Sequence, residues 1–270
     1  MLKKIKYVLK NIPVFGPLGN HTARFVKKTS RKLRGKTSRG WEKYVFKRHE
    51  LTKNSGQSGN FSVQQVTNLL NYCKSSTAGQ GAGPADFPAS VSITVDGHFL
   101  KGSRDPEERL EHFPSNWEGK TVLDIGCNHG GMLFSIADKI GHGIGIDFDI
   151  ATVNAANKIR SANGSQNLDF YAFDLENEDL NLIRDFIVDE KVDITFLLAV
   201  CAWIQNPNEV IEFVSKISKT LLFETNGGED EQQSQLASLH KCYENVETLY
   251  QVKNNKNGEE YIQRRLLFCT

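Results

Sequence analysis

One stretch of this 270-residue chain is more informative than any other, and it reads Val122-Leu123-Asp124-Ile125-Gly126-Cys127-Asn128-His129-Gly130-Gly131. Its first residues are mostly apolar, as in a buried β-strand, and its last residues open a helical segment. Gly126 and Gly130 let the backbone approach a ligand closely, because glycine has no side chain. The helix that follows presents free N–H groups at its start. We therefore expect a ligand at the turn between this strand and this helix.

The chain around this stretch alternates between short apolar segments and helical segments. We expect strands at 121–125, 143–146, 168–172, 192–198 and 220–223, with helices at 131–139, 151–161, 180–188 and 208–219. Apolar strands that alternate with helices predict a parallel sheet covered on both faces. A polar helix at 230–240 follows, and then strands at 246–252 and 261–269. The Asn-rich turn between these last two strands predicts an antiparallel pair.

Charge divides the chain into a basic start and an acidic remainder. Residues 1–50 carry fifteen Lys and Arg against two acids, a net +13, and the remainder carries −12. We predict a basic, partly helical N-terminal arm at 1–55 and a lead-in at 56–118. The lead-in has a helix at 61–72, a Gly-rich loop at 74–90 and a hairpin at 91–100. A basic arm favours a polyanionic partner, either anionic lipid or nucleic acid.

Composition excludes several classes of protein. With 39% hydrophobic and 24% charged residues the chain is typical of a globular protein. Its longest uncharged apolar stretch, 194–204, is shorter than the roughly 20 residues of a membrane-spanning helix. Lys10 and Asn11 interrupt what would be the apolar core of a signal peptide. Five dispersed cysteines without a C-x-x-C pair favour reduced thiols in the cytoplasm. Neither they nor any acidic or histidine cluster predicts a metal site.

Two further acids follow the next strands. Asp147 ends the second strand, where a carboxylate can accept both hydroxyls of a ribose. Asp174 follows the third strand. One interpretation is a generic nucleotide-binding α/β unit, for example one that binds NAD. The dinucleotide pattern is G-x-G-x-x-G, whereas this loop has Asn128 in its middle position and Asp124 two residues before its first glycine.

This arrangement closely resembles the first motif of class I S-adenosylmethionine (SAM)-dependent methyltransferases, D-x-G-C-x-x-G. The resemblance covers residues 119–270, which we expect to form the methyltransferase domain. It implies a doubly wound, Rossmann-like, mostly parallel seven-stranded sheet with an antiparallel last strand, and SAM as the cofactor. It places these residues at the cofactor: Asp124 at the methionine end, the backbone of Gly126, Cys127, Asn128 and Gly130 around it, Asp147 on the ribose, Phe148 against the adenine, and Asp174 with Leu175 at the adenine amino group.

The acceptor side is less defined. The family places residues near the transferred methyl group after the fourth strand, here 199–204, and makes Trp203 a candidate substrate contact. The Asn/Asp-Pro-Pro-aromatic signature of exocyclic base methylation is absent there. The segment 97–111, with Arg104, weakly resembles bacterial methyltransferases of polysaccharides and small molecules. Residues 222–225 weakly resemble wobble-uridine tRNA carboxymethyl-transfer enzymes.

A hydroxyl acceptor also needs a general base. The candidates are His129 in the loop, Glu224 at the end of a parallel strand, and His98 in the hairpin. His129 has a simpler alternative as a solvent-exposed loop residue. For the substrate candidates, Arg104 in a surface salt bridge and Trp203 in the core are the alternatives.

The function predicted from these features is SAM-dependent O-methylation of a small molecule, or of a sugar or glycan precursor. The basic arm suits a cytoplasmic enzyme in peripheral contact with the anionic inner face of a membrane. A tRNA-modifying methyltransferase is an alternative, in which the arm binds phosphate. A SAM-binding scaffold without catalysis is another.

Overall fold

The structure is a computed structural model, and it describes residues 65–67, 69–70, 91–102, 104–113, 116–256 and 259–270. These residues all belong to one compact unit, residues 49–270. The predicted arm at 1–55 and the Gly-rich loop at 74–90 lie outside the described residues. Of the helix predicted at 61–72, the described residues are helical, and Val66 and Leu70 are buried. Within the described part of the chain, no helix combines the length and apolarity needed to cross a membrane.

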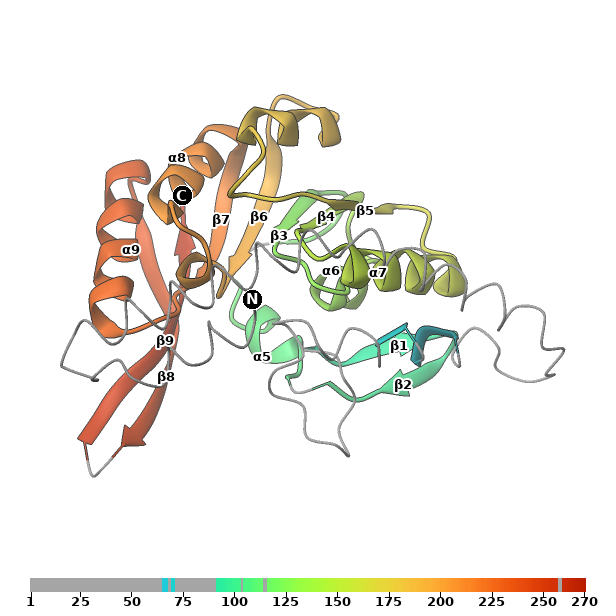
Figure 1. Ribbon diagram of the computed structural model, residues 1–270, viewed down its shortest axis with the longest axis horizontal. Coiled ribbons are helices and arrows are strands. Elements are labelled where there is room, and N and C mark those ends of the chain that lie inside the picture. The colour runs from blue at the N-terminus through green and yellow to red at the C-terminus, as the bar shows by residue number, and fades with distance from the viewer. Residues whose placement is uncertain (1–64, 68, 71–90, 103, 114–115, 257–258) are drawn as a thin grey trace, which may run out of the picture. The chain divides into compact units, whose positions relative to one another are not determined.

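A seven-stranded sheet forms the centre of this unit, in the order β5-β4-β3-β6-β7-β9-β8 (Figure 1). Its strands are β3 (Thr121–Ile125), β4 (His142–Asp147), β5 (Leu168–Ala172), β6 (Val192–Leu198), β7 (Ser218–Glu224), β8 (Val246–Lys256) and β9 (Glu259–Cys269). The first five are parallel, and β9 lies antiparallel between β7 and β8. This confirms the predicted α/β class and the antiparallel last strand.

The helical segments precede β3 or connect the strands of this sheet. They are α5 (Glu107–Leu110), α6 (Gly131–Ser135), α7 (Ile150–Asn163), η2 (Leu180–Phe186), η3 (Cys201–Trp203), α8 (Pro207–Ile217) and α9 (Glu229–Cys242). The prediction of a helix to residue 139 is wrong: α6 ends at Ser135, whose hydroxyl donates to the carbonyl of Met132 at 2.6 Å. The segment predicted as a helix at 180–188 is a 3₁₀-helix that ends at Phe186.

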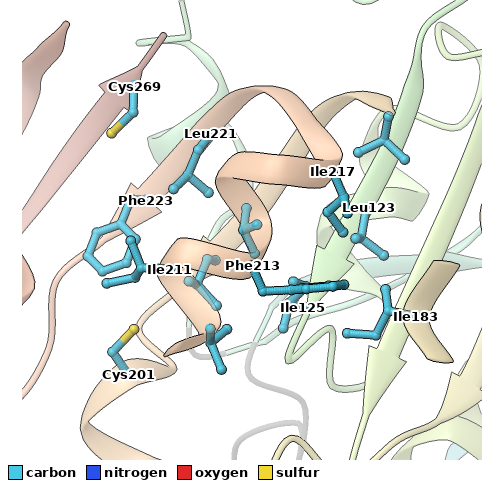
Figure 2. Close-up of a cluster of buried hydrophobic side chains, with 14 of the residues drawn as sticks. Leu123, Ile125, Ile183, Cys201, Ile211, Phe213, Ile217, Leu221, Phe223 and Cys269 are labelled. Carbon is cyan, nitrogen blue, oxygen red and sulfur yellow. The ribbon is translucent and has the colours of Figure 1, made fainter. Parts of the chain in front are cut away.

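Side chains from the two faces of the sheet form two hydrophobic clusters. Val122 belongs to one cluster, whereas Leu123 and Ile125 belong to the other, because successive residues of a strand point to opposite faces. Figure 2 shows the cluster around Leu123 and Ile125, where Phe213 of α8 packs near β3. The second cluster includes Met132 of α6. Both faces of the sheet are therefore covered by helices, as predicted.

A two-stranded hairpin precedes the sheet, as predicted. It consists of β1 (Ile93–Val95) and β2 (His98–Leu100), joined by a turn with φ of 48° at Asp96 and 75° at Gly97. The side chain of Asn163 in α7 accepts the Asp96 N–H and donates to the Thr94 carbonyl, both at 2.8 Å. The hairpin is thereby attached to α7, beside the start of the sheet.

Candidate active site

The chemistry-bearing residues meet at the carboxyl ends of β3, β4 and β6. The neighbours of β3 in the sheet are β4 on one side and β6 on the other, so the chain changes direction at β3. In doubly wound sheets a crevice opens at this point, outside the carboxyl ends of the strands. The turn after β3 and the end of β4 border that position.

The loop at 126–130, which we name the cofactor loop, has an unusual backbone. Gly126, Asn128 and Gly130 all have positive φ, at 78°, 54° and 82°. The N–H groups of Gly126 and Cys127 both donate to the carbonyl of Ile146, at 2.8 and 3.0 Å. These bonds fix the start of the loop against β4. The loop therefore requires glycine at its two ends, where a side chain would strain the left-handed conformation.

Asp147 holds the other side of this loop. One of its carboxylate oxygens accepts the N–H of Asn128 and the other accepts the N–H of Asp149, both at 2.9 Å. Burial raises the pKa of Asp147 to about 6, although these two N–H groups act to lower it. Each oxygen has a second lone pair. The carboxylate can therefore keep the loop in place and still accept a ribose hydroxyl.

Asp124 is the other buried carboxylate of the site. Its side chain is 3% exposed, and no hydrogen-bond partner of its Oδ2 is found in the described part of the chain. Burial raises the pKa of Asp124 to about 7; Arg109 acts to lower it and Asp147 to raise it further. Buried polar atoms are nearly always hydrogen-bonded in proteins. An acceptor without a donor at this position fits a ligand that carries its own donors, such as the amino acid end of SAM.

The residues expected at the adenine lie beside one another after β4 and β5. Asp147 and Ala172 are register partners, and the N–H of Phe173 donates to the Asp147 carbonyl at 2.9 Å. Phe148 is 54% exposed and free to cover a ring. Asp174 accepts from the Glu176 N–H and the Asn177 amide, at 2.9 and 2.7 Å, and Leu175 packs against the core. The predicted cofactor residues thus all lie at the carboxyl-terminal end of the parallel strands.

His129 is fully buried, which excludes the alternative of an exposed loop residue. Its Nδ1 lies 2.6 Å from the Asn128 side-chain oxygen, and its Nε2 lies 3.1 Å from the carbonyl of Val91. Burial lowers the pKa of His129 to about 4. The ring therefore connects the cofactor loop to the segment before β1, and its role as a general base stays a prediction.

Glu224 is buried at the end of β7, and its carboxylate forms ion pairs with Arg109 of α5 and with Arg264 of β9, the latter at 3.0 Å. Arg264 donates a hydrogen bond to Oε1, whereas Oε2 lies beside Arg109 and has no hydrogen-bond partner in the described part of the chain. The carboxylate therefore pairs with two arginines, and its role as a general base stays a prediction.

The two predicted substrate residues lie outside the sheet strands, Arg104 between β2 and α5 and Trp203 in η3. Arg104 is half-buried, and the structure records no ion pair of its guanidinium group with any described residue, which excludes a surface salt bridge within that part of the chain. Trp203 in η3 is 47% exposed, which excludes the alternative of a core tryptophan. His98 is exposed in β2, where its Nδ1 lies 2.8 Å from the Asp96 carbonyl.

Three residues of the site escaped the sequence analysis: Arg109, Arg264 and Asn226. Asn226 follows β7, and its amide donates to the Ala199 carbonyl and accepts from the Ala202 N–H, at 2.7 and 2.9 Å. Its position two residues beyond a strand end was a usable signal. The arginines gave none, because their carboxylate partner is far away in the sequence.

Comparison with known proteins decides the family. The sequence model of the family described as "Methyltransferase domain" matches residues 116–264, more than half of the chain. The chain belongs to this family. The match confirms the recognition of a SAM-dependent methyltransferase from its sequence motif, and with it the predicted cofactor.

Two curated relatives match shorter parts. A protein of Invertebrate iridescent virus 6 named as a methyltransferase, 235L, is 30% identical over 103 residues, which cover 37% of this chain and 34% of that protein. A protein of Arabidopsis thaliana named a probable RNA methyltransferase is 38% identical over 63 residues, which cover 22% of this chain and 20% of that protein. The chain thus spans 34% and 20% of the length of these two relatives.

Solved structures share the fold at low sequence identity. The N-terminal domain of EvdMO1 with S-adenosylhomocysteine (SAH) bound is 13% identical, with a TM-score of 0.55, over 80% of this chain and 98% of that one. The same domain in the presence of SAH and D-fucose has a TM-score of 0.51, at 13% identity, over 75% and 95%. These likenesses show the fold.

Proposed function

We propose that this methyltransferase transfers a methyl group from SAM to a hydroxyl oxygen of a small molecule, or of a sugar or glycan precursor. The observation that carries the choice of a small acceptor is the sequence after β6, where the Asn/Asp-Pro-Pro-aromatic signature of exocyclic base methylation is absent.

The residues that would hold the cofactor lie at or just after the carboxyl ends of β3, β4 and β5. They are Asp124, Gly126, Cys127, Asn128, Gly130, Asp147, Phe148, Asp174 and Leu175. When bound, SAM supplies a methyl group activated by a positive sulfonium. The chain must hold the acceptor oxygen in line with that methyl group and exclude water. Arg104 and Trp203 are our candidates for orienting the acceptor. His129 and Glu224 act in this proposal as positioning residues.

Methyl incorporation by the full chain tests the proposal. The chain is incubated with SAM that carries a labelled methyl group, in separate reactions with monosaccharides, nucleotide sugars and bulk tRNA, and products are read by mass spectrometry. We expect an O-methylated product in a sugar reaction, and much less of it at limiting SAM when Asp147 is replaced by Ala. Label in tRNA alone would contradict the proposal and select the RNA alternative. SAM binding without label in any reaction would select the scaffold.

The tRNA alternative rests on one observation, the 63-residue match to the Arabidopsis protein named a probable RNA methyltransferase. The basic segment 1–50 suits phosphate binding as well. We rank this second because the match covers a fifth of that protein.

A further inference from the structure

Two loops at the carboxyl end of the sheet leave adjacent strands toward opposite faces. The cofactor loop follows β3 and leads into α6, whose Met132 packs in the cluster on one face. Residues 199–203, which we name the β6 loop, follow β6 and lead to α8, whose Val210 packs in the cluster on the other face. β3 and β6 are adjacent parallel strands. Because ligands of doubly wound sheets bind in the crevice between two such loops, the β6 loop borders the same crevice as the cofactor loop.

The two loops touch at Gly126. A Cβ atom on Gly126 would lie 2.5 Å from Cγ2 of Val200, and its next two neighbours are also atoms of Val200. Val200 is half-buried and packs against the cluster around Leu123 and Ile125. The next residue, Cys201, is buried in that cluster (Figure 2). The Val200 side chain is thus a fixed support against the first residue of the cofactor loop.

Asn226 fixes the backbone on both sides of Val200. Its amide donates to the Ala199 carbonyl at 2.7 Å and accepts the N–H of Ala202 at 2.9 Å. Ala199 has a φ of 58°, a left-handed conformation that residues with a side chain seldom adopt. Asn226 is buried, and its own N–H and carbonyl are both bonded to the side chain of Gln235. The β6 loop is therefore held in place from the end of β7.

The end of the β6 loop depends on the same residue. The backbone N–H of Trp203 donates to the carbonyl of Val200 at 2.8 Å. Trp203 is our candidate for orienting the acceptor, and its side chain is 47% exposed. Holding Val200 in place therefore also holds the backbone of this candidate acceptor contact.

We propose that Asn226 is a positioning residue for methyl transfer, which acts through Val200 on the cofactor loop. Its amide sets the backbone of the β6 loop, and the Val200 side chain transmits that setting to Gly126. The cofactor loop is thereby held in the shape that binds SAM. The inference rests on the proposed function, because it concerns the same site, but its test needs no acceptor.

Calorimetric titration of the full chain with SAH tests this role, and urea unfolding reports whether each variant is folded under the titration conditions. Asn226→Ala should weaken SAH binding about fivefold, because two hydrogen bonds that shape the site are lost. Thr121→Val is the matched control. It also removes two side-chain hydrogen bonds, both with Asp193 at 3.0 Å, but at the amino end of β3.

Thr121→Val should lower the free energy of unfolding and leave SAH affinity at the parental value. If Asn226→Ala does the same, its amide is merely structural and the proposal is overturned. Equal losses of SAH affinity in the two variants would also overturn it, because general loosening of the sheet would then explain both.

A double-mutant cycle tests whether Asn226 acts through Val200. Val200→Ala removes the methyl groups that contact Gly126, so it should weaken SAH binding about threefold. In that background Asn226→Ala should weaken SAH binding less than about twofold further, because the side chain that transmits its effect is gone.

Two further results would overturn the proposal: effects of Asn226→Ala and Val200→Ala that multiply in full, and a parent chain that does not bind SAH. The first would show that the two residues act independently. A failure to find an O-methylated product would leave all these SAH measurements unchanged, so this inference and the proposed function fail separately.

Discussion

Gly126 is subject to two separate constraints, and a matched glycine separates them. Its φ is 78°, and a Cβ atom would lie 2.5 Å from Cγ2 of Val200. Gly164 has a similar φ of 67° with nothing within 4 Å of a Cβ. Gly164→Ala should therefore cost only the left-handed strain, about 1–2 kcal/mol. Gly126→Ala should cost roughly 1–3 kcal/mol more, because Val200 must move.

Urea unfolding of both variants measures this difference, and SAH titration measures its effect on the site. We expect weaker SAH binding for Gly126→Ala alone. Equal unfolding free energies for the two variants would show that Val200 does not restrict the cofactor loop.

Asp124 and Asp147 give the site a dependence on pH. Their pKa values, about 7 and about 6, are raised chiefly by burial. A raised carboxyl pKa means that the folded chain holds protons more tightly than the unfolded chain. The stability of the unliganded chain should thus fall as pH rises through this range. A ligand that donates hydrogen bonds to these carboxylates prefers them ionised, so SAH affinity should rise from about pH 5 to pH 8.

Calorimetry across that range checks the direction of the change. Asp124→Asn should flatten the upper part of the profile, because the amide does not ionise. If the SAH affinity of the parent chain does not change with pH, neither Asp124 nor Asp147 accepts hydrogen bonds from the ligand.

Local patterns predict some of these residues, and long-range contacts decide the rest. Asp147 was predictable because it ends a short apolar strand. His129 was not, because its ring nitrogen lies near the carbonyl of Val91, 38 residues earlier. The ion pair of Glu224 was not predictable either, because its partner Arg264 lies 40 residues later, on a strand whose pairing is irregular. No local pattern encodes such pairings.

At the scale of elements, Asn226 connects the ends of β6 and β7. It bonds to Ala199 and Ala202 after β6, and its backbone exchanges two hydrogen bonds with Gln235 of α9, at 3.2 and 2.8 Å. Ala199 has a φ of 58°, and the hydrogen bonds of Asn226 hold the chain in this left-handed conformation. Asn226→Ala should destabilise the fold by about 1–3 kcal/mol, because the part-buried backbone groups of Ala199 and Ala202 lose their hydrogen bonds to the amide.

Urea unfolding checks this expectation, with Gln233→Ala as the control. Gln233 is exposed on α9 and bonds to Glu229 one turn away, so its loss should change stability by a few tenths of a kcal/mol. Similar losses in the free energy of unfolding would show that the hydrogen bonds of Asn226 stabilise the fold no more than an exposed side-chain pair does.

Element boundaries followed from the sequence where apolar runs end sharply. The strands expected at 168–172 and 192–198 have those bounds. β8 and β9 extend beyond the predicted 246–252 and 261–269, because backbone pairing continues to Lys256 and Glu259. Those added residues are polar and have no alternation, so they resemble a turn. Hairpin pairing needs only backbone groups, which the side-chain pattern does not report.

At the scale of the whole molecule, the basic arm at residues 1–55 leads to a separate prediction. Each Lys or Arg near an anionic bilayer contributes about 1 kcal/mol, and an amphipathic helix at residues 1–12 would add apolar burial. The full chain should float with anionic vesicles at physiological salt, and a chain that starts at Gly56 should not. Equal flotation of the two chains, or none, would refute membrane attachment. A tRNA filter-binding assay on the same chains tests the competing partner.

The central claim is that the ends of β3 and β4 bind SAM, and calorimetric titration of the full chain with SAH tests it most directly. The parent chain and Asp138→Ala, which removes an exposed acid after α6, should bind equally. Asp147→Ala should bind SAH about tenfold more weakly, or more weakly still. A charge-assisted hydrogen bond is worth roughly 1.5–3 kcal/mol, and 1.4 kcal/mol corresponds to a tenfold change in affinity. Unchanged SAH affinity in a folded Asp147→Ala chain would contradict the account.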